Sequence, residues 1–569
     1  MKNISRRDFL KGAVAGSAGI AAASLFGGLT AFAEDAKEDA VKAEAGVPEW
    51  LGAAPEISDS DCVETIDTEI LVVGAGCSGL FATAAAAEAG AKVLLIERSA
   101  QGMSIRCSAL GAVGSKIQKE HGVEINKTDI INDMCHYALN ANDMNLVKLW
   151  ADNSGEALDW YADFLAKYGR CEIALEYTMP GQPTRYQGWP TGHGTKAIDM
   201  PPDANPLDYP EGLVYEDMMD YINGFGGEVR HQTTMLCLIR ESGKVVGVYA
   251  ENKDKEKIRI NASKGVILAT GGYANNREMY AALQPENLKS IGTMLAYPFS
   301  NGAGIKAAMW EGAKLDPNQC TMIFDRCAMA PDEDAGTPYD VPFPPRYYHM
   351  ASQPFLKVNK NGQRICNESS PYDFVVHGAR KFPGNLWYQI FDSNWKEDVT
   401  RFHTIGCSTM IQWEGGNHQG EGLDAVEAGL PAFIEGGMMM KADTLEELAD
   451  KLLIDKENFL ATVARYNELA EKGEDEDFGK EAFRLSKIEQ GPFYGIKIAG
   501  INLCTMNGLH INTKCQVLTE DNEVIEGLYA VGNDSGNYYL DTYPNLAAGA
   551  NAGRCATFGR LTGKYLASL

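Results

Sequence analysis

The sequence lacks the cysteine patterns that hold a metal, a c-type haem or a disulfide framework. Its 13 cysteines are scattered without a CxxC pair, and no CxxCH haem-attachment sequence occurs. After residue 33 it also lacks any apolar run of about 18 residues, the length that a membrane-spanning helix needs. We therefore expect no metal, no c-type haem and no integral membrane segment in the mature chain.

Positive charge is scarce as well. The chain has 51 Lys and Arg against 77 Asp and Glu, which gives a formal net charge of −26. Such a charge repels nucleic acid and anionic lipid, so no nucleic-acid partner is expected. An acidic surface suits docking to a basic redox partner, although a solvated acidic face accounts for the same composition.

The N-terminus has the order of an export signal. Twin arginines in SRRDFLKG (5–12) are followed by a weakly apolar run, and Ala31, Phe32 and Ala33 then precede an acidic stretch. This order predicts a twin-arginine signal peptide over 1–33, with a membrane anchor as the alternative. Residues 34–64 are acidic and Ala-rich and predict a flexible linker. We expect a protein exported with its cofactor bound, to the periplasm or the outer face of the cytoplasmic membrane.

A dinucleotide-binding unit begins at about residue 68. The apolar run ILVV leads into Gly74-x-Gly76-x-x-Gly79, an Ala-rich segment predicts a helix, and a second apolar strand ends on Glu97. The glycines suit a tight turn, a close approach of the backbone to a pyrophosphate and close helix packing, while Glu97 suits a ribose diol. The expected cofactor-binding residues here are Gly74, Gly76, Ser78, Gly79, Glu97 and Arg98. The pattern does not separate FAD from NAD.

Further segments resemble one flavoprotein superfamily. GVILATGGYANN (265–276), NGAGIKAAMWEGAKL (301–315), GPFYGIKI (491–498) and EGLYAVGN (526–533) are similar, in the same order, to segments of FAD-dependent fumarate reductases and succinate dehydrogenases. The resemblance covers nearly everything from Thr68 onward. It implies an α/β fold, in which a split Rossmann-type domain binds FAD non-covalently and an inserted α+β capping domain encloses the substrate.

The resemblance also implies where the domains lie. The FAD-binding domain would comprise residues 65–325 and return over 497–569, with the capping domain at 326–496. Alternation and a turn near Gly243 predict a small β-meander over 229–261. The further FAD contacts that the resemblance implies are Ser104, Ala109, Gly111, Gly271, Asn533, Ala547 and Ala548.

The positions that bind dicarboxylates in that superfamily are changed here. A family histidine corresponds to Cys504 in CTMNG, a C-terminal arginine to Tyr543, and the proton-delivering arginine to Lys396 in FDSNWK. A second family histidine, of an HPT motif, has no counterpart. A pocket without these cations does not offset the desolvation of two carboxylates, which costs several kcal/mol each. Fumarate and succinate are therefore not the expected substrates.

The changed positions resemble 3-ketosteroid dehydrogenases of the same superfamily. NESSPYD (367–373) matches their NExxPYD, and a tyrosine-proline pair begins ten residues after Asn533. The resemblance implies that Tyr372 and Tyr543 handle a proton and polarise a ketone. Lys396 is a further candidate, and a third tyrosine would be Tyr177, with Tyr186 as the alternative.

A phenol suits such a site because its pKa of about 10 leaves it neutral at pH 7, and it can still donate a hydrogen bond to an enolate-like oxygen. We expect an exported FAD-dependent oxidoreductase that reduces an activated C=C bond in an enone, enoate or aryl acrylate. A separate cytochrome or membrane donor would supply the electrons. The alternatives are a 3-ketosteroid-type dehydrogenase working oxidatively and, in another class, a non-catalytic flavin electron carrier.

Overall fold

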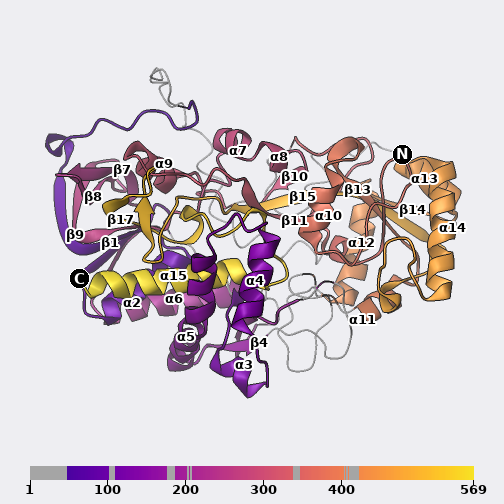
Figure 1. Ribbon diagram of the computed structural model, residues 1–569, viewed down its shortest axis with the longest axis horizontal. Helices are drawn as coiled ribbons and strands as arrows, with labels where there is room; N and C mark the ends of the chain where they lie inside the picture. The colour runs from indigo at the N-terminus through magenta and orange to yellow at the C-terminus, as the bar shows by residue number, and fades with distance from the viewer. Residues whose placement is uncertain are drawn as a thin grey trace.

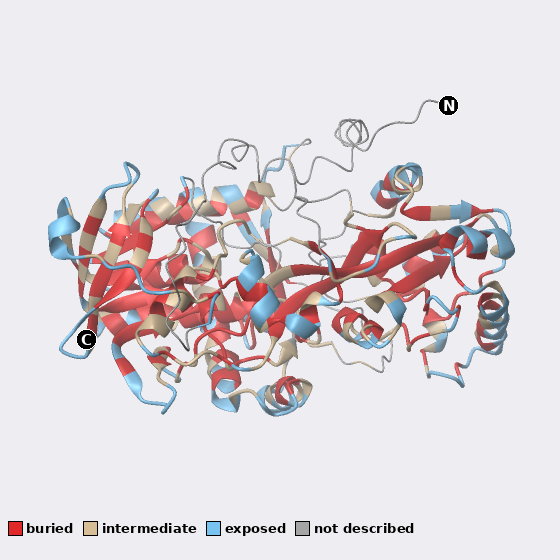
Figure 2. Cartoon of the chain, turned by 90° about the horizontal axis from the view of Figure 1, so that it is seen from above, coloured by how far each residue is buried: buried red, intermediate tan, exposed pale blue. Residues whose placement is uncertain are grey.

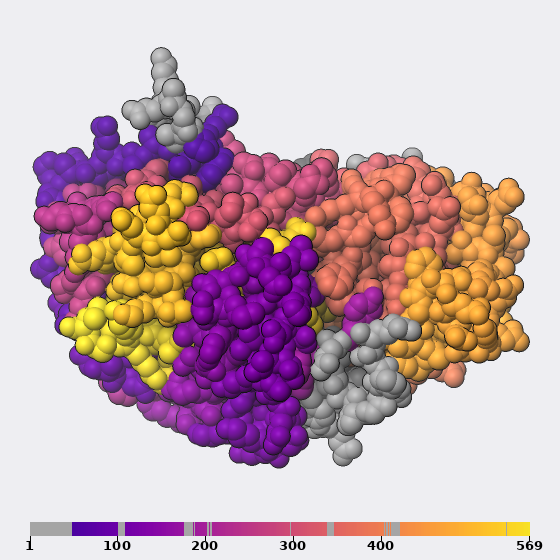
Figure 3. All heavy atoms as spheres, in the orientation of Figure 1, coloured from indigo at the N-terminus to yellow at the C-terminus, as the bar shows by residue number. Residues whose placement is uncertain are grey.

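The computed structural model describes residues 48–100, 109–175, 186, 188–201, 204, 208–295, 297–337, 346–402, 404, 408, 410 and 422–569. Two sheets lie along the long axis of the molecule (Figure 1). Segments from both ends of the sequence mix in one half, and residues of about 440–490 form the far end of the other (Figure 3). No helix in the described ranges combines the length and the apolar character needed to cross a membrane.

The first sheet is the nucleotide sheet, in the strand order β16-β17-β9-β1-β2-β6. β17, β9, β1, β2 and β6 run parallel to one another, whereas β16 pairs antiparallel with β17. The apolar segments of β1, β2 and β9 are buried because helices cover them. β17 joins this sheet from the C-terminal part of the chain. The bounds are β1 Glu64–Val73, β2 Val93–Ile96, β6 Glu228–Arg230, β9 Lys257–Leu268, β16 Gln516–Leu518 and β17 Val524–Ala530.

Two helices beside this sheet pack against each other at very short range. In α15 (Ala550–Ala567), a Cβ on Gly559 would lie 2.2 Å from the Ser78 carbonyl oxygen of α2 (Cys77–Glu88). Only glycine permits that approach, which joins the two ends of the chain.

The expected meander is confirmed, because β7 (Thr234–Glu241) and β8 (Lys244–Glu251) pair antiparallel with each other and then with β9. Residues 48–63 differ from the expected tether. Trp50 is buried, and Arg259 of β9 donates two hydrogen bonds to Asp59. Acidic residues of this segment therefore pair with the meander instead of remaining solvated.

The second sheet has seven strands in the order β12-β13-β15-β11-β18, with β10 and β14 also paired to β15. The expected domain boundaries at 325/326 and 496/497 fall inside β11 and β15, which pair antiparallel with each other. The sheet is thus continuous from the FAD-binding part into the cap. The bounds are β10 Ile291–Met294, β11 Cys320–Met329, β12 Leu356–Val358, β13 Trp387–Phe391, β14 Met439–Ala442, β15 Phe493–Thr505 and β18 Asp541–Thr542.

Cap helices cover this second sheet, with buried strands inside and exposed helix faces outside (Figure 2). In α13 (Leu445–Leu452) and α14 (Lys456–Lys472) the apolar positions at helical spacing are buried, apart from Leu445, which is half-buried. The other cap helices are α10 Tyr372–Ala379, α11 Trp395–Phe402 and α12 Leu423–Glu435.

The other described elements surround the nucleotide sheet and its junction with the cap. The helices are α3 Lys116–Glu120, α4 Lys127–Tyr137, α5 Met144–Tyr168, α6 Asp208–Gly224, α7 Arg277–Leu283, α8 Pro285–Leu288 and α9 Ala303–Trp310, and the strands are β3 Leu110–Gly111, β4 Cys171–Leu175 and β5 Gly192–Ala197.

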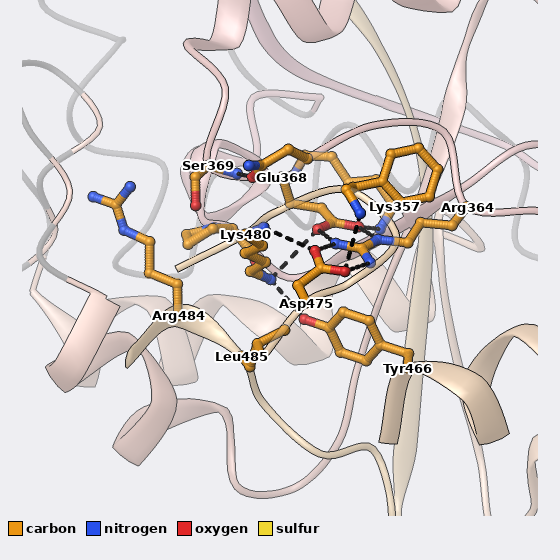
Figure 4. Close-up of polar contacts among 12 residues, drawn as sticks. Lys357, Arg364, Glu368, Ser369, Tyr466, Asp475, Lys480, Arg484 and Leu485 are labelled. Atoms are coloured by element: carbon orange, nitrogen blue, oxygen red, sulfur yellow. Dashed lines mark hydrogen bonds and ion pairs between the residues drawn. The ribbon is translucent and has the colours of Figure 1, made fainter. Parts of the chain in front are cut away.

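A buried charge cluster holds the cap together (Figure 4). Arg364 donates hydrogen bonds to both Glu368 and Asp475, and the Lys480 ammonium lies 3.6 Å from Glu368. Lys480 also donates to the Tyr466 hydroxyl at 2.6 Å. Because Glu368 lies four residues before Tyr372, the cluster fixes the segment that leads into α10.

Candidate FAD and substrate site

The glycine loop after β1 has the geometry of a phosphate cradle. Gly74 has φ +106°, and a Cβ there would lie 2.4 Å from the Ala269 carbonyl oxygen. A Cβ on Gly79 would lie 1.9 Å from the Gly74 carbonyl oxygen, so neither glycine tolerates a side chain. Gly76, the N-cap of α2, faces open space, since no atom lies within 4 Å of its Cβ position. The space in front of this helix N-terminus suits a pyrophosphate.

Glu97 lies directly beside this loop. Its carboxylate accepts hydrogen bonds from the backbone N–H groups of Ala75 and Ser99, each at 2.8 Å. The carboxylate is therefore held at the end of β2, where a ribose diol would meet it. The neighbouring Arg98 guanidinium lies 5.2 Å from the centre of the Phe299 ring, and burial lowers the pKa of Arg98.

Asp534 joins the two halves of the FAD site and was not expected from the sequence. Its buried carboxylate accepts hydrogen bonds from the backbone N–H groups of Thr270 and Gly272, in the turn that follows β9 and contains Gly271. Beside it, the Asn533 side-chain oxygen accepts a hydrogen bond from Asn551 at 3.0 Å. An acidic residue directly after the buried strand β17 was the signal for this role.

Small residues from distant segments form one wall of the site. The backbone N–H of Gly111 donates to the Gly549 carbonyl at 2.8 Å, and the Ala109 backbone lies against Gly549. Ala547 forms a bridge with Trp189, and the Ala548 carbonyl accepts a hydrogen bond from Thr191. Among the expected FAD contacts, Ala109, Gly111, Ala547 and Ala548 are thus brought together; Ser104 lies outside the described residues. The glycine loop, the acid at the end of β2 and this narrow wall fit FAD.

Tyr372 is the first residue of α10 and packs on β11. Its ring meets the Phe324 ring edge-on, at a centroid distance of 5.5 Å and an angle of 81°. The residue is 3% exposed. Pro371 directly before it suits the start of the helix, which places the phenol at the helix N-terminus.

Tyr543 approaches the same stretch of β11 from the other side. Thr542 of β18 pairs with Thr321 of β11, and Tyr543 directly follows Thr542 as the chain leaves β18. Phe324 is three residues beyond Thr321 on β11, or about 10 Å. The buried Tyr543 hydroxyl donates a hydrogen bond to the Ala547 carbonyl at 3.3 Å. The register therefore brings the two tyrosines toward one short stretch of strand.

Tyr137, at the end of α4, supports this arrangement. Its ring stacks on Phe374 of α10 at 4.7 Å, and its hydroxyl donates to the Tyr543 carbonyl at 3.4 Å. Tyr186 lies nearby, because the Ser370 hydroxyl donates to its hydroxyl at 3.0 Å. Tyr177, the preferred third tyrosine, lies outside the described residues. The structure thus brings the alternative, Tyr186, next to the segment that carries Tyr372.

Lys396 does not join this group. Its ammonium forms ion pairs with Glu427 at 2.5 Å and Asp424 at 3.3 Å, both on α12, and the hydrogen bond to Glu427 raises its pKa. The side chain is 37% exposed. Its contacts give no support to the expected role in proton delivery.

Two neutral side chains come from the strands on either side of β11. Cys504 of β15 pairs with Met322 on one side, and Tyr543 follows Thr542 of β18, which pairs with Thr321 on the other. Asn551 donates a hydrogen bond to the Cys504 sulfur at 3.8 Å. These are the positions at which the sequence resemblance implied a histidine and an arginine in dicarboxylate reductases, and here neither supplies a cation.

An α/β FAD-binding fold with a cap, and two buried tyrosines beside β11, fit an FAD-dependent oxidoreductase that acts on carbon-carbon bonds. The chain belongs to the family described as FAD binding domain, whose model matches residues 69–547. The expected fold class, superfamily and FAD cofactor are confirmed by this match and by the relatives below.

The chain resembles both reductases and dehydrogenases of this kind. Vinyl phenol reductase of Lactiplantibacillus plantarum is 27% identical over 517 residues, which cover 88% of this chain and 96% of the relative. 3-oxosteroid 1-dehydrogenase of Mycolicibacterium smegmatis is 30% identical over 374 residues, which cover 60% of this chain and 59% of the relative. The open conformation of a flavocytochrome c3 fumarate reductase, 25% identical, covers 90% of this chain and 79% of its own with a TM-score of 0.61.

Proposed function

We propose that this oxidoreductase reduces a C=C bond conjugated to a carbonyl or aryl group, in a substrate less anionic than fumarate. The observation that carries the proposal is the pair of neutral side chains, Cys504 on β15 and Tyr543 directly after β18, on the two sides of β11. The similarity to vinyl phenol reductase over nearly the full length of both chains supports an aryl-conjugated alkene. Enones, enoates and aryl acrylates share this chemistry.

FAD, when bound, supplies the hydride for the reduction. The chain's own contribution is a proton and a hydrogen-bond donor. Tyr543 would donate its hydroxyl to the conjugated oxygen, beside the N-terminus of α15, whose dipole stabilises negative charge. Tyr372 would give its proton to the substrate carbon, and the N-terminus of α10 would stabilise the phenolate that remains. The buried surroundings of both phenols exclude water from this transfer.

A 3-ketosteroid-type dehydrogenase is the second candidate, and the similarity to 3-oxosteroid 1-dehydrogenase favours it. The same two tyrosines would then act in reverse, with Tyr372 accepting a proton from a saturated ketone polarised by Tyr543. A flavin electron carrier without a substrate is disfavoured, because a carrier needs neither a cap nor two buried phenols.

We also propose that the protein is exported by the twin-arginine pathway and receives electrons from a separate cytochrome or membrane donor. The twin arginines at Arg6 and Arg7, the small residues that end at Ala33 and the acidic net charge support this. Expression with a tagged C-terminus, followed by cell fractionation of the wild type and a variant with both arginines changed to lysine, tests the export.

The test of activity uses purified protein with bound FAD and a chemically reduced viologen. Fumarate, urocanate, cinnamates, vinyl phenols and steroid enones would be offered in turn. We expect dye oxidation with a neutral or singly charged conjugated alkene and little with fumarate. Oxidation of a saturated ketone with an artificial acceptor, without any reductive activity, would favour the dehydrogenase. Turnover with fumarate alone would refute the substrate class.

A further inference from the structure

The elements that carry the two tyrosines also meet at a second point, one that the proposed chemistry does not use. His377 and Arg380, on the C-terminal side of α10, approach the Asp541 carboxylate of β18. The distances are 3.5 Å from His377 Nε2 and 3.7 Å from an Arg380 terminal nitrogen. Asp541 lies only two residues before Tyr543.

The geometry makes this contact a constraint on both tyrosines. From Tyr372 to Arg380, α10 advances about 12 Å, and β11 spans about 13 Å from Phe324 back to Cys320. Since Tyr372 packs on Phe324, and Asp541 pairs with Cys320, the helix lies along β11 with its two ends over these two points. α10 and β11 are neighbours in Figure 1. The contact between the C-terminal end of α10 and Asp541 therefore constrains the distance between the phenols of Tyr372 and Tyr543.

The polar atoms of this contact are incompletely paired. His377 Nδ1 lies 2.7 Å from the Asp373 carbonyl, and since a carbonyl only accepts, Nδ1 carries a hydrogen. Nε2 then needs a second proton to donate to Asp541. Neither His377 Nε2 nor Arg380 Nε has a hydrogen-bond partner within the part of the chain that the structure describes. A movement of α10 by well under 1 Å would bring both side chains to hydrogen-bond distance of the carboxylate.

The charges around the contact favour this movement. Partial burial disfavours a charge on Asp541, but His377 and Arg380 outweigh burial and lower the pKa of its carboxyl. Arg380 also donates to Asn287 and faces the charge of Glu286 and the hydroxyl of Tyr280. Asp541 is the group that His377 and Arg380 both approach.

We propose that His377, Arg380 and Asp541 form a clamp that positions Tyr372 against Tyr543 and tightens when the substrate is enclosed. The three are positioning residues, which act through the tyrosines and do not touch the substrate. The expected effect on kcat rests on the proposed function. The expected effect on the order of α10 rests only on the contact between α10 and Asp541.

Asp541→Asn is the sharpest variant. Asp541 has φ +60°, a conformation that asparagine tolerates as well as aspartate, so this change removes the charge without adding backbone strain. We expect unchanged FAD content, little change in KM and a kcat lower by about 10- to 100-fold, since a misplacement of about 1 Å has such an effect. The matched control is Asp450→Asn, which removes an exposed ion pair with Lys456 and should leave kcat unchanged.

His377→Gln provides the second variant. Its amide can keep the bond to the Asp373 carbonyl while losing the contact with Asp541, so we expect kcat to fall with little change in KM, as in Asp541→Asn. The double variant Asp541→Asn/His377→Gln should be no slower than Asp541→Asn alone, because both changes break one contact.

Hydrogen exchange of the α10 amides tests the clamp without any turnover. Exchange over residues 373–380 should be faster in Asp541→Asn than in the wild type and unchanged in Asp450→Asn. Should no substrate be found, a faster exchange would still support the contact while the proposed function fails. Wild-type kcat together with wild-type exchange in Asp541→Asn would overturn the clamp.

Discussion

Replacing Glu368 by glutamine tests whether charge balance in the buried cluster of Figure 4 holds the cap together. Glu368 accepts two hydrogen bonds from Arg364, at 2.8 and 2.7 Å, and its side chain is fully buried. Burial opposes its charge, but Lys480 and Arg364 outweigh burial and lower the pKa of the carboxyl. The variant keeps the shape and leaves two cations, Arg364 and Lys480, facing the single carboxylate of Asp475.

Breaking a buried pair in this way costs about 3 to 5 kcal/mol. For a unit of the size of the capping domain, each kcal/mol lowers the Tm by about 2 to 4 °C, so we expect a decrease of about 6 to 20 °C. The assay is thermal unfolding of the FAD-loaded protein, followed by circular dichroism and by flavin fluorescence.

Two further variants sharpen this test. Adding Lys480→Met to Glu368→Gln restores the charge balance and should recover part of the loss, since the second change removes the unpaired cation. Glu476→Gln, which loses an exposed pair with Lys472, should change stability by less than about 1 kcal/mol. A Tm of Glu368→Gln within about 2 °C of the wild type would show that Glu368 is already neutral, and would refute the reasoning.

Three other predictions follow from the site and the cap. Tyr543→Phe should keep FAD bound but lower kcat by about 100-fold, because the conjugated oxygen loses its donor; a near-normal rate in the viologen assay would remove Tyr543 from the mechanism. Gly79→Ala should lower the FAD content and reduce the free energy of unfolding by about 1 to 3 kcal/mol, because its Cβ would lie 1.9 Å from the Gly74 carbonyl oxygen. The control is Gly212→Ala in α6, where no atom lies within 4 Å of the Cβ position, so this change should be neutral or stabilising. Flavin absorbance and thermal unfolding measure both variants. Burial alone would raise the pKa of Asp475, but its hydrogen bonds from Arg364 and the backbone lower that pKa to about 2. Asp475 therefore contributes about 2 kcal/mol above pH 4 that is lost as the pH falls toward 2, and the acid unfolding curve of Asp475→Asn should be shallower in that range; equal slopes would contradict the pairing.

Much of the FAD site could be predicted because its determinants are local. Gly74, Gly76 and Gly79 follow one strand, and Glu97 ends the next, so a short stretch of sequence contains the turn, the helix N-terminus and the acid together. Asp534 was missed because its partners, the N–H groups of Thr270 and Gly272, are more than 260 residues away in the sequence. Only the pairing of β17 with β9 brings them together.

The substrate site was predictable as a set of residue types but not as an arrangement. The sequence alone indicated tyrosines at 372 and 543 and the absence of the dicarboxylate cations. It also offered Lys396 as a further candidate, whose contacts in the fold are with α12. The local sequence around a helical lysine does not determine whether its side chain faces a pocket or an acidic neighbour, because the direction of the side chain depends on packing between distant elements.

The sequence by itself indicated a dinucleotide site through its glycine spacing and strand pattern, and FAD and the fold through its resemblance to one flavoprotein superfamily. It also predicted a substrate pocket without the dicarboxylate cations, because these signals are properties of short segments. Only the tertiary structure decided which residues meet. The register of β15 on β11 sets Cys504 opposite Met322, and the pairing of β18 with β11 brings Tyr543 to the other side of that strand. The course of α10 along β11 sets Asp541 beside His377 and Arg380. Strand register between segments far apart depends on the whole sheet, and no local pattern contains it.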